Sequence, residues 1–272
     1  MSRGLFDLTG KIALITGGNS GIGLGFARGI ARQGGTVEIW GRNGDKNAAA
    51  QSELASFGGV VTTRLVDVTD EAAVAAGYAA LLAEHGRVDF VLANSGRSSR
   101  NTGGDITTMT SQEWHDLLAT NLHGAFYTLR EGARHMKVRA EAGDPGGSLV
   151  FCGSLAIFHG VAGIENYAAS KGGMDAVIRT MAAELGQYGI RCNTVAPGFI
   201  MTEIMGQGPH VAQIEGFFAS KTPVPRSGKP ADFEGIAAYL CSDASSFHTG
   251  DTIVIDGGSL INPPYALTGM GG

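Results

Sequence analysis

A short apolar strand that runs straight into a glycine-rich loop and then a helix is the feature that most constrains this fold. Residues 11–16 form the predicted strand, the loop carries Gly17, Gly21 and Gly23, and residues 24–33 have a helical pattern. Glycines let the backbone approach a phosphate, and a helix N-terminus presents free N–H groups. The spacing G-x-x-x-G-x-G departs from the common G-x-G-x-x-G. We interpret it as a phosphate-binding loop; a turn without a ligand is the alternative in a chain with 43 glycines.

Strand-like and helical segments alternate along the chain without a linker or an internal repeat. The other predicted strands span residues 36–40, 60–66, 88–93, 148–152, 190–196 and 252–255, and helical patterns fall near 45–57, 70–85, 111–141, 166–187 and 230–241. Strands separated by helices imply right-handed crossovers and a parallel sheet. We therefore expect an α/β fold in a single domain, residues 1–272, built as a Rossmann-like three-layer sandwich with helices on both faces of a parallel sheet.

Composition narrows the class of protein. The apolar fraction of 43% and the charged fraction of 17% are those of a soluble globular protein. A net charge of −5 argues against nucleic-acid binding. The N-terminus lacks a signal-peptide core, and no apolar run reaches the ~20 residues of a membrane span. Cys152, Cys192 and Cys241 have no metal-site spacing, so we expect buried thiols, no metal and a cytoplasmic, reducing location.

Three side chains in the middle of the chain carry acid–base chemistry. Tyr167 and Lys171 are four residues apart, so on a helix they share one face. A phenol is a poor acid–base group at neutral pH, but a lysine ammonium beside it favours the phenolate. Ser154 lies in an earlier segment, where its hydroxyl can hold a carbonyl or alcohol oxygen. The pattern indicates a device that moves a proton on and off an oxygen, with an interfacial tyrosine and a solvated lysine as the alternative.

Together these motifs resemble the short-chain dehydrogenase/reductase family over residues 8–260. The order and spacing match for Thr16-Gly17-x-x-x-Gly21-x-Gly23, Asn94-Ser95-Gly96, Asn121, Ser154, Tyr167-x-x-x-Lys171 and Pro197-Gly198. The family's Asn-Asn-Ala-Gly appears here as Ala93-Asn94-Ser95-Gly96, which keeps the second Asn and the Gly.

The resemblance implies the catalytic roles. Tyr167 is the expected proton donor for ketone reduction and the base for alcohol oxidation. Lys171 assists it and binds the nicotinamide ribose, and Ser154 polarises the substrate oxygen. Asn121 resembles the asparagine that kinks a helix and holds a water beside the lysine.

The resemblance also implies a nicotinamide cofactor and the residues that bind it. The expected cofactor-binding residues, besides Tyr167 and Lys171, are Gly17, Asn19, Ser20, Gly21, Ile22, Gly23, Arg42, Asp67, Val68, Asn94, Gly96, Pro197, Gly198, Ile200 and Thr202. Asp67 and Val68 match the pair that contacts adenine. The segment from Pro197 matches the one that holds the carboxamide of the nicotinamide.

The end of the second strand predicts which cofactor is preferred. A carboxylate there would bind the ribose hydroxyls and repel a 2′-phosphate, but this chain has Gly41-Arg42-Asn43. Arg42 offers a planar, charged fork for a phosphate, and Asn19 and Ser20 can add hydrogen bonds. We expect NADP(H). NAD(H) stays an alternative because Ser20 stands where the family often has a second basic residue. Gly41→Asp with Arg42→Leu is therefore expected to reverse the preference.

The substrate is less constrained than the cofactor. Its expected surroundings are mostly apolar: Arg97, Leu155, Phe158, His159, Ile164, Phe199, Met201, Met205 and Phe217. We expect a small-molecule ketone or alcohol of medium size, with residues 202–229 as a lid and 262–272 as a tail. Arg97 and Arg100 would suit an acidic substrate or an acyl-carrier group; a solvated loop is the alternative.

Three functional hypotheses follow. The first is an NADP(H)-dependent carbonyl reductase or alcohol dehydrogenase. The second, a narrower form of the first, is a 3-oxoacyl reductase. The third is a cofactor-sensing or scaffold protein of the same fold. The resemblance further implies a homotetramer that pairs the helices near Asn121 and Tyr167. The predicted strand at 252–255 is more apolar than an exposed edge strand should be, so we expect another segment or subunit to pack against it.

Overall fold

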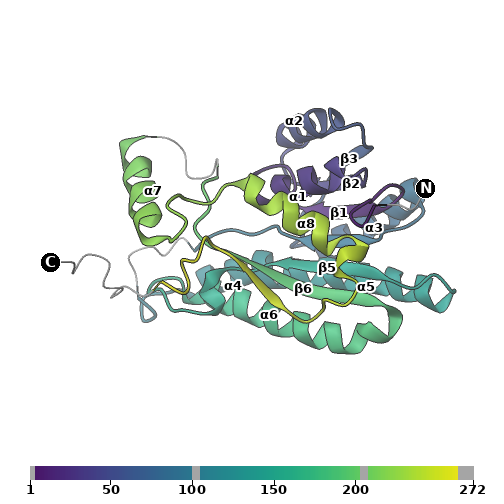
Figure 1. Cartoon of the computed structure of the whole chain (residues 1–272). Helices are drawn as coiled ribbons and strands as arrows, with labels where there is room; N and C mark the ends of the chain where they lie inside the picture. Colours follow the sequence, from purple (N-terminus) through teal and green to yellow (C-terminus); the bar gives the residue numbers. More distant parts are fainter. Residues whose placement is uncertain (1–3, 100–104, 203–207, 263–272) are drawn as a thin grey trace.

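The computed structural model describes residues 4–99, 105–202 and 208–262. These residues form one seven-stranded sheet in the order β3-β2-β1-β4-β5-β6-β7 (Figure 1), and every neighbouring pair is parallel. The strands are β1 (Ile12–Thr16), β2 (Thr36–Gly41), β3 (Val61–Leu65), β4 (Phe90–Ala93), β5 (Gly147–Cys152), β6 (Ile190–Pro197) and β7 (Thr252–Ile255). All seven predicted strands are confirmed, with shifts of one or two residues at some ends.

Helices cover both faces of the sheet, which confirms the three layers (Figure 1). One layer holds α1 (Gly21–Arg32), α2 (Gly44–Ala55) and α8 (Glu234–Leu240), and the other holds α3 (Glu71–His85), α4 (Ser111–Leu118), α5 (Gly124–Glu141) and α6 (Glu165–Leu185). A further helix, α7 (Pro209–Lys221), stands away from the sheet in Figure 1. No helix within the described ranges is long and apolar enough to cross a membrane.

Strand residues alternate between two separate hydrophobic cores. Ala13 and Ile15 of β1 pack with Phe26 of α1 in one core, whereas Leu14 packs with Tyr78 of α3 in the other. Successive side chains of a strand point to opposite faces, so a strand covered on both sides is mostly apolar. The five residues of β1 are all buried accordingly.

Two predicted helices differ from a regular α-helix. The segment 111–141 contains a π turn at Ala119–His123 between α4 and α5. Single π turns inside helices often mark functional sites, and this one contains the fully buried Asn121. The segment 230–241 begins with a 3₁₀ turn at Pro230–Phe233, and α8 follows it. Proline lacks a backbone N–H, so it is tolerated at the start of such a segment.

Close contact between α1 and the segment around α8 depends on glycine. A Cβ built on Gly29 would lie 2.1 Å from the carbonyl oxygen of Glu234, so the two backbones would have to separate. We expect Gly29→Ala to lower the free energy of unfolding by about 1–3 kcal/mol, the usual cost of overpacking. Gly235→Ala on α8 is the matched control, because no described atom lies within 4 Å of its added Cβ. Chemical denaturation should show the loss for Gly29→Ala only; equal stability of the two variants would contradict the packing.

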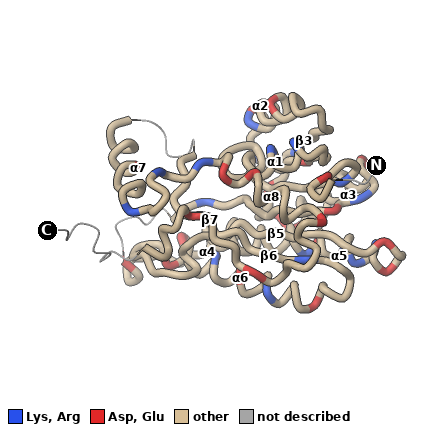
Figure 2. Tube along the Cα trace, viewed as in Figure 1, with Lys and Arg blue, Asp and Glu red and all other residues tan. Residues whose placement is uncertain are grey.

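Charges are spread over the molecule rather than collected on one side. Figure 2 shows Lys and Arg interspersed with Asp and Glu along the trace.

Candidate active site and cofactor site

The predicted functional residues gather at one edge of the sheet, where the strands have their carboxyl ends. Strand order reverses between β1 and β4, and ligands of open α/β sheets bind at such a switch point. Gly17 follows β1, Arg42 follows β2, Asn94 follows β4 and Gly198 follows β6. The fold therefore brings together segments that are far apart in the sequence.

The loop between β1 and α1 has the geometry of an anion site. Gly17 and Gly21 have φ angles of +65° and +53°, a backbone region that favours glycine. A Cβ on Gly23 would lie 2.3 Å from the carbonyl oxygen of Gly17, so the turn is too tight for another residue. Ser20 is the N-cap of α1, yet its side chain makes no capping hydrogen bond within the described residues. The first N–H groups of α1 are thus left for a ligand, and a phosphate fits them.

The end of β4 is tied to the glycine loop by side chains. Asn94 Nδ2 donates to the carbonyl oxygens of Thr16 at 3.1 Å and Gly17 at 3.3 Å. The Thr16 hydroxyl accepts from the backbone N–H groups of Asn94 and Ser95, both at 3.1 Å. These contacts use the serine only through its backbone, so Ser95 in place of the family's alanine leaves the turn intact.

Asn121 lies at the π turn and holds the segment that follows β4. Its Nδ2 donates to the carbonyl oxygen of Arg97 at 2.8 Å, and its Oδ1 accepts from the Arg97 N–H at 2.9 Å. The side chain therefore fixes a backbone segment. The position of a Cβ built on Gly96 lies 3.4 Å from Asn121 Oδ1 and 3.6 Å from Lys171 Nζ, so these three residues meet at one point.

Lys171 and Tyr167 lie on the same face of α6, as predicted. The buried Lys171 Nζ donates to the carbonyl oxygen of Cys152 at 2.7 Å and lies 5.7 Å from the centroid of the Tyr167 ring. Ser154 follows β5 and begins a 3₁₀ turn, where its Oγ accepts from the Ala156 N–H at 3.2 Å. Because the Oγ accepts that bond, its own hydrogen can be donated to a substrate oxygen.

The start of α6 is positioned by a residue that the sequence analysis did not single out. Asn166 is 2% exposed; its Oδ1 accepts from the Tyr167 N–H at 2.8 Å, and its Nδ2 donates to the Glu113 carbonyl oxygen at 3.2 Å. The amide thus joins α6 to α4 one residue before the tyrosine. The neighbouring Glu165 begins α6, and its Oε2 is buried without a hydrogen-bond partner among the described residues.

Arg42 and Asp67, both predicted at the adenosine end of the cofactor, lie side by side. Arg42 Nη1 is 3.5 Å from Asp67 Oδ2. Partial burial raises the pKa of the Asp67 carboxyl, but hydrogen bonds from Thr69 and the charge of Arg42 outweigh it and hold the pKa below its ordinary value. Val68, the other predicted adenine contact, is buried and packs against Gly124 at the start of α5.

The polar side chains of the glycine loop also make hydrogen bonds within the protein. Asn19 Nδ2 donates to Asn47 Oδ1 at 2.6 Å, and Ser20 Oγ donates weakly to Asn19 Oδ1 at 3.5 Å. A Cβ built on Gly41 would lie 2.4 Å from Asn19 Nδ2 and 2.6 Å from Asn47 Oδ1. The expected reversal by Gly41→Asp with Arg42→Leu ignored this crowding, because nothing in the sequence placed Asn47 at that point.

The segment after β6 closes the other side of the site. The Gly198 N–H donates to the Ile255 carbonyl oxygen at 3.0 Å, and Ile200 forms a bridge with Gly228. Thr202 Cγ2 lies 3.3 Å from the position of a Cβ on Gly21. The structure thus places the predicted carboxamide segment against the predicted phosphate loop.

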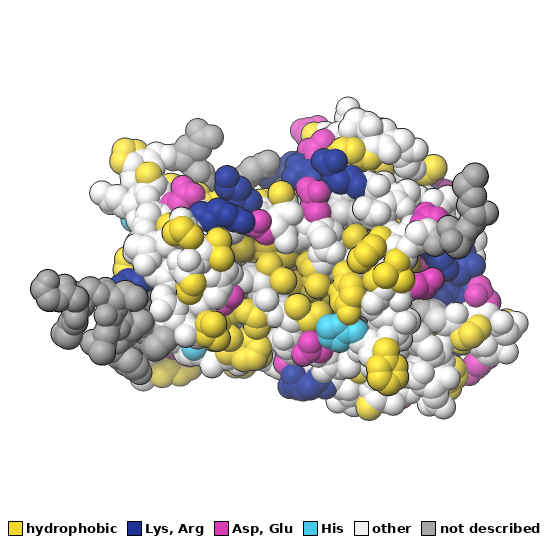
Figure 3. Space-filling model, viewed as in Figure 1, with side chains coloured by type: hydrophobic (Ala, Val, Ile, Leu, Met, Phe, Trp, Pro, Cys, Tyr) yellow, Lys and Arg dark blue, Asp and Glu magenta, His cyan; other side chains and the backbone are white. Residues whose placement is uncertain are grey.

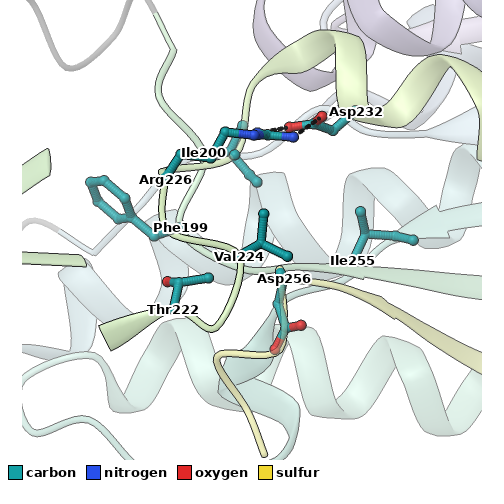
Figure 4. A pocket seen from close by; sticks show the side chains of 10 residues that line it. Phe199, Ile200, Thr222, Val224, Arg226, Asp232, Ile255 and Asp256 are labelled. Carbon is teal, nitrogen blue, oxygen red and sulfur yellow. Dashed lines mark hydrogen bonds and ion pairs between the residues drawn. The ribbon is translucent and has the colours of Figure 1, made fainter. Parts of the chain in front are cut away.

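A cavity of about 170 Å³ lies between the ends of β6 and β7 and the chain after α7 (Figure 4). Ile200, Val224 and Ile255 are among its lining, and a bidentate ion pair between Arg226 and Asp232 crosses its rim with both bonds at 2.7 Å. Ile200, in the lining of this cavity, is also one of the residues expected to bind the cofactor. The four predicted catalytic side chains do not line it, so we do not assign it to the reacting groups.

The residues expected around the substrate fall into distinct environments. Phe199 stacks on Phe218 with ring centroids 3.9 Å apart, which joins the end of β6 to α7. Leu155 is buried, whereas Phe158 and Phe217 are exposed. His159 is exposed, Arg97, Ile164 and Met201 are partly buried, and Arg100 and Met205 lie outside the described residues.

The three cysteines are buried, as predicted, and they are free thiols. Burial raises the pKa of Cys192 and of Cys241 to about 12, which keeps both in the neutral form. Within the described ranges, the group of His, Cys, Asp and Glu atoms close enough to share a metal ion is Glu38, Glu84 and His85. Arg64 pairs with both carboxylates there, at 2.9 and 2.8 Å, and so supplies the positive charge.

Comparison with known proteins agrees with this architecture. The model of a family described as enoyl-(acyl carrier protein) reductase matches residues 17–259. A 3-oxoacyl-[acyl-carrier-protein] reductase of Chlamydia pneumoniae is 34% identical over 254 residues, which cover 92% of this chain and 97% of that protein. An NADP-dependent (R)-specific alcohol dehydrogenase of Lentilactobacillus kefiri is 35% identical over 260 residues, with 92% and 97% covered.

A solved structure extends the similarity to three dimensions. The crystal structure of a putative short-chain alcohol dehydrogenase from Sinorhizobium meliloti 1021 has a TM-score of 0.87 and 32% identity, and the match covers 96% of this chain and 100% of that one. The chain belongs to the short-chain dehydrogenase/reductase family of oxidoreductases.

Proposed function

We propose that this protein is an NADP(H)-dependent oxidoreductase that interconverts a ketone or aldehyde with an alcohol. The observation that carries the proposal is the position of Lys171 Nζ, which lies beside the Tyr167 ring and close to Gly96. Ser154 follows the adjacent β5 and can donate a hydrogen bond. A proton donor, its assisting cation and a group for the substrate oxygen thus share one edge of the sheet.

The residues at this edge fit a dinucleotide. The uncapped N-terminus of α1 and the tight glycine turn suit its phosphates, and Asp67 and Val68 stand where adenine would lie. Pro197, Gly198, Ile200 and Thr202 would hold the carboxamide end. When bound, the nicotinamide supplies the hydride.

Each catalytic side chain then has one task in ketone reduction. Ser154 donates a hydrogen bond to the substrate oxygen and stabilises the charge that develops there. Tyr167 gives its phenolic proton to that oxygen, and it takes the proton back during alcohol oxidation. Lys171 stabilises the phenolate that remains. Asn121 fixes the backbone of Arg97 and thereby the wall beside Gly96.

The proposed preference for NADP(H) depends on Arg42. Its side chain is 68% exposed beside the proposed adenosine end, and the last residue of β2 is Gly41 rather than an acidic residue. A relative of 35% identity is an NADP-dependent alcohol dehydrogenase, which supports the assignment.

A turnover screen tests the function. Purified protein is mixed with NADPH or NADH and a panel of ketones, aldehydes and 3-oxoacyl thioesters, and oxidation of the cofactor is followed. We expect turnover of ketones, faster with NADPH. Binding of cofactor without turnover of any compound would favour the cofactor-sensing alternative. Turnover confined to the thioesters would favour a 3-oxoacyl reductase, the activity named for the 34% identical relative.

We further propose one catalytic domain, in the cytoplasm, with residues 202–229 as a lid over the substrate, of which 203–207 lie outside the described residues. The stacked pair of Phe199 and Phe218 supports the lid, because it connects α7 to the site. The three unpaired buried thiols suit a reducing compartment.

A homo-oligomer is proposed from the outermost strand, β7, and four subunits from the family resemblance. β7 has one strand neighbour, β6, and its residues Ile253, Val254 and Ile255 are only partly buried. Figure 3 shows hydrophobic side chains gathered across the middle of the face where Figure 1 places this strand. An apolar edge of this kind calls for a partner. Light scattering is expected to give a mass of four times the 28.0 kDa of one chain. A monomer mass in dilute solution would contradict the proposal.

A further inference from the structure

The space beside Gly41 is filled by two side-chain amides. Gly41 is the last residue of β2 and is buried. A Cβ there would lie 2.4 Å from Asn19 Nδ2 and 2.6 Å from Asn47 Oδ1. At such separations something must move if residue 41 carries a side chain, and because both contacted atoms are side-chain ends, the cost depends on how firmly Asn19 and Asn47 are held. The space beside Gly41 is therefore crowded by two side-chain amides, and the contacts that hold these amides determine whether a larger residue fits there.

Asn47 is held rigidly at this point. It is 3% exposed in the first turn of α2. Its Nδ2 donates to the carbonyl oxygen of Gly41 at 3.3 Å and to that of Arg64 at 3.4 Å, at the ends of β2 and β3. Because Nδ2 faces these carbonyls, Oδ1 must face the glycine loop, where Asn19 Nδ2 donates to it at 2.6 Å. One buried amide thus joins two strand ends to the phosphate loop.

We propose that Asn47 is a specificity-determining residue for the cofactor, acting through Asn19. It holds the Asn19 amide in the space that a side chain at position 41 would need. A carboxylate at the end of β2, the group that would bind the ribose hydroxyls of NAD(H), is thereby excluded by sterics as well as by sequence. Arg42, directly after this strand end, is then the positively charged side chain that we propose binds the 2′-phosphate. The inference rests on the proposed use of a nicotinamide cofactor.

This arrangement makes residues 41 and 47 energetically coupled. A carboxylate introduced at position 41 displaces Asn19 and distorts the loop that binds both cofactors. Shortening residue 47 removes the acceptor that fixes Asn19, so the loop can adjust and the new carboxylate can reach the ribose. Residues that share one contact network show this kind of non-additivity.

Dissociation constants for NADPH and NADH, measured by cofactor fluorescence, test the coupling without a known substrate. We expect Gly41→Asp alone to weaken both cofactors by ~10-fold or more, a loss typical of overpacking. In the Gly41→Asp/Asn47→Ala double variant, NADH should bind ~10-fold more tightly than to Gly41→Asp, while NADPH should not recover. Gly44→Asp is the control for charge, because no described atom lies within 4 Å of its Cβ; it should leave the NADPH-to-NADH ratio within ~3-fold of wild type.

The outcomes separate this inference from the proposed function. If Gly41→Asp alone binds NADH as tightly as the double variant does, the blocking role of Asn47 is wrong. If wild type binds NADH more tightly than NADPH, the proposed preference is wrong, while the coupling is still read from the variants. If the Gly41→Asp/Asn47→Ala variant does not fold by circular dichroism, Gly41→Asp/Asn19→Gly takes its place, because it removes the nearer amide and keeps the bonds of Asn47 to the strands. Failure of that variant to regain NADH binding would also overturn the inference.

Discussion

Replacing Tyr167 with Phe is expected to lower kcat by ~10²–10⁴-fold, the usual contribution of a general acid, while folding and cofactor affinity stay close to wild type. The substitution removes the phenolic hydroxyl and keeps the ring, so the packing beside Lys171 persists. The backbone N–H of residue 167 still donates to Asn166. Steady-state kinetics with a ketone found in the screen would measure the effect.

The matched control is Tyr188→Phe in the 3₁₀ turn beyond the other end of α6. It also removes a phenolic hydroxyl, but far along the helix from Lys171, and kcat should stay within ~3-fold of wild type. If Tyr167→Phe keeps near-normal turnover, another group moves the proton and the assignment of the catalytic acid is wrong.

Removal of the Arg42 charge should produce the second large effect. Arg42→Leu is expected to weaken NADPH binding by about 1.5–3 kcal/mol, the value of hydrogen bonds to a charged group. NADH binding should change little, because NADH lacks the 2′-phosphate. Calorimetric titration of wild type and variant with both cofactors gives the comparison.

Arg134→Leu is a suitable control for the loss of one surface charge. Arg134 is 60% exposed on α5 and pairs with Glu131. Its replacement should leave the affinity for both cofactors unchanged. A loss of NADPH affinity common to both variants would mean that net charge, rather than a local contact of Arg42, governs binding.

The sequence was sufficient to predict the three layers and to place the candidate site at the carboxyl ends of the strands. Four of the five buried positions of β1 are apolar, which predicts a strand covered on both faces; the fifth is Thr16. The spacing of Tyr167 and Lys171 predicted a shared helix face because α-helix geometry is regular. Glycines at positions 17, 21 and 23 predicted the tight loop, and the φ angles and close contacts there agree.

Long-range side-chain contacts could not be predicted in the same way. Asn47 and Asn166 look like ordinary polar residues near helix starts, and both turn out to be buried amides that tie one element to another. The π turn at Ala119–His123 likewise has no local signal; Asn121 makes its two bonds to Arg97, 24 positions away in the chain. Propensity and periodicity report on neighbours in sequence, whereas these features are fixed by tertiary packing.

Hydride tracing is the most direct test of the central claim that this site reduces a carbonyl with a nicotinamide cofactor. Wild-type protein and the Tyr167→Phe variant are each given the ketone panel with NADPH that carries deuterium on the transferable position of the nicotinamide ring. The account predicts that wild type forms an alcohol with deuterium on the carbinol carbon and that Tyr167→Phe forms ~10²–10⁴-fold less per unit time. Folded, cofactor-binding wild type that forms no deuterated alcohol from any compound in the panel would contradict it.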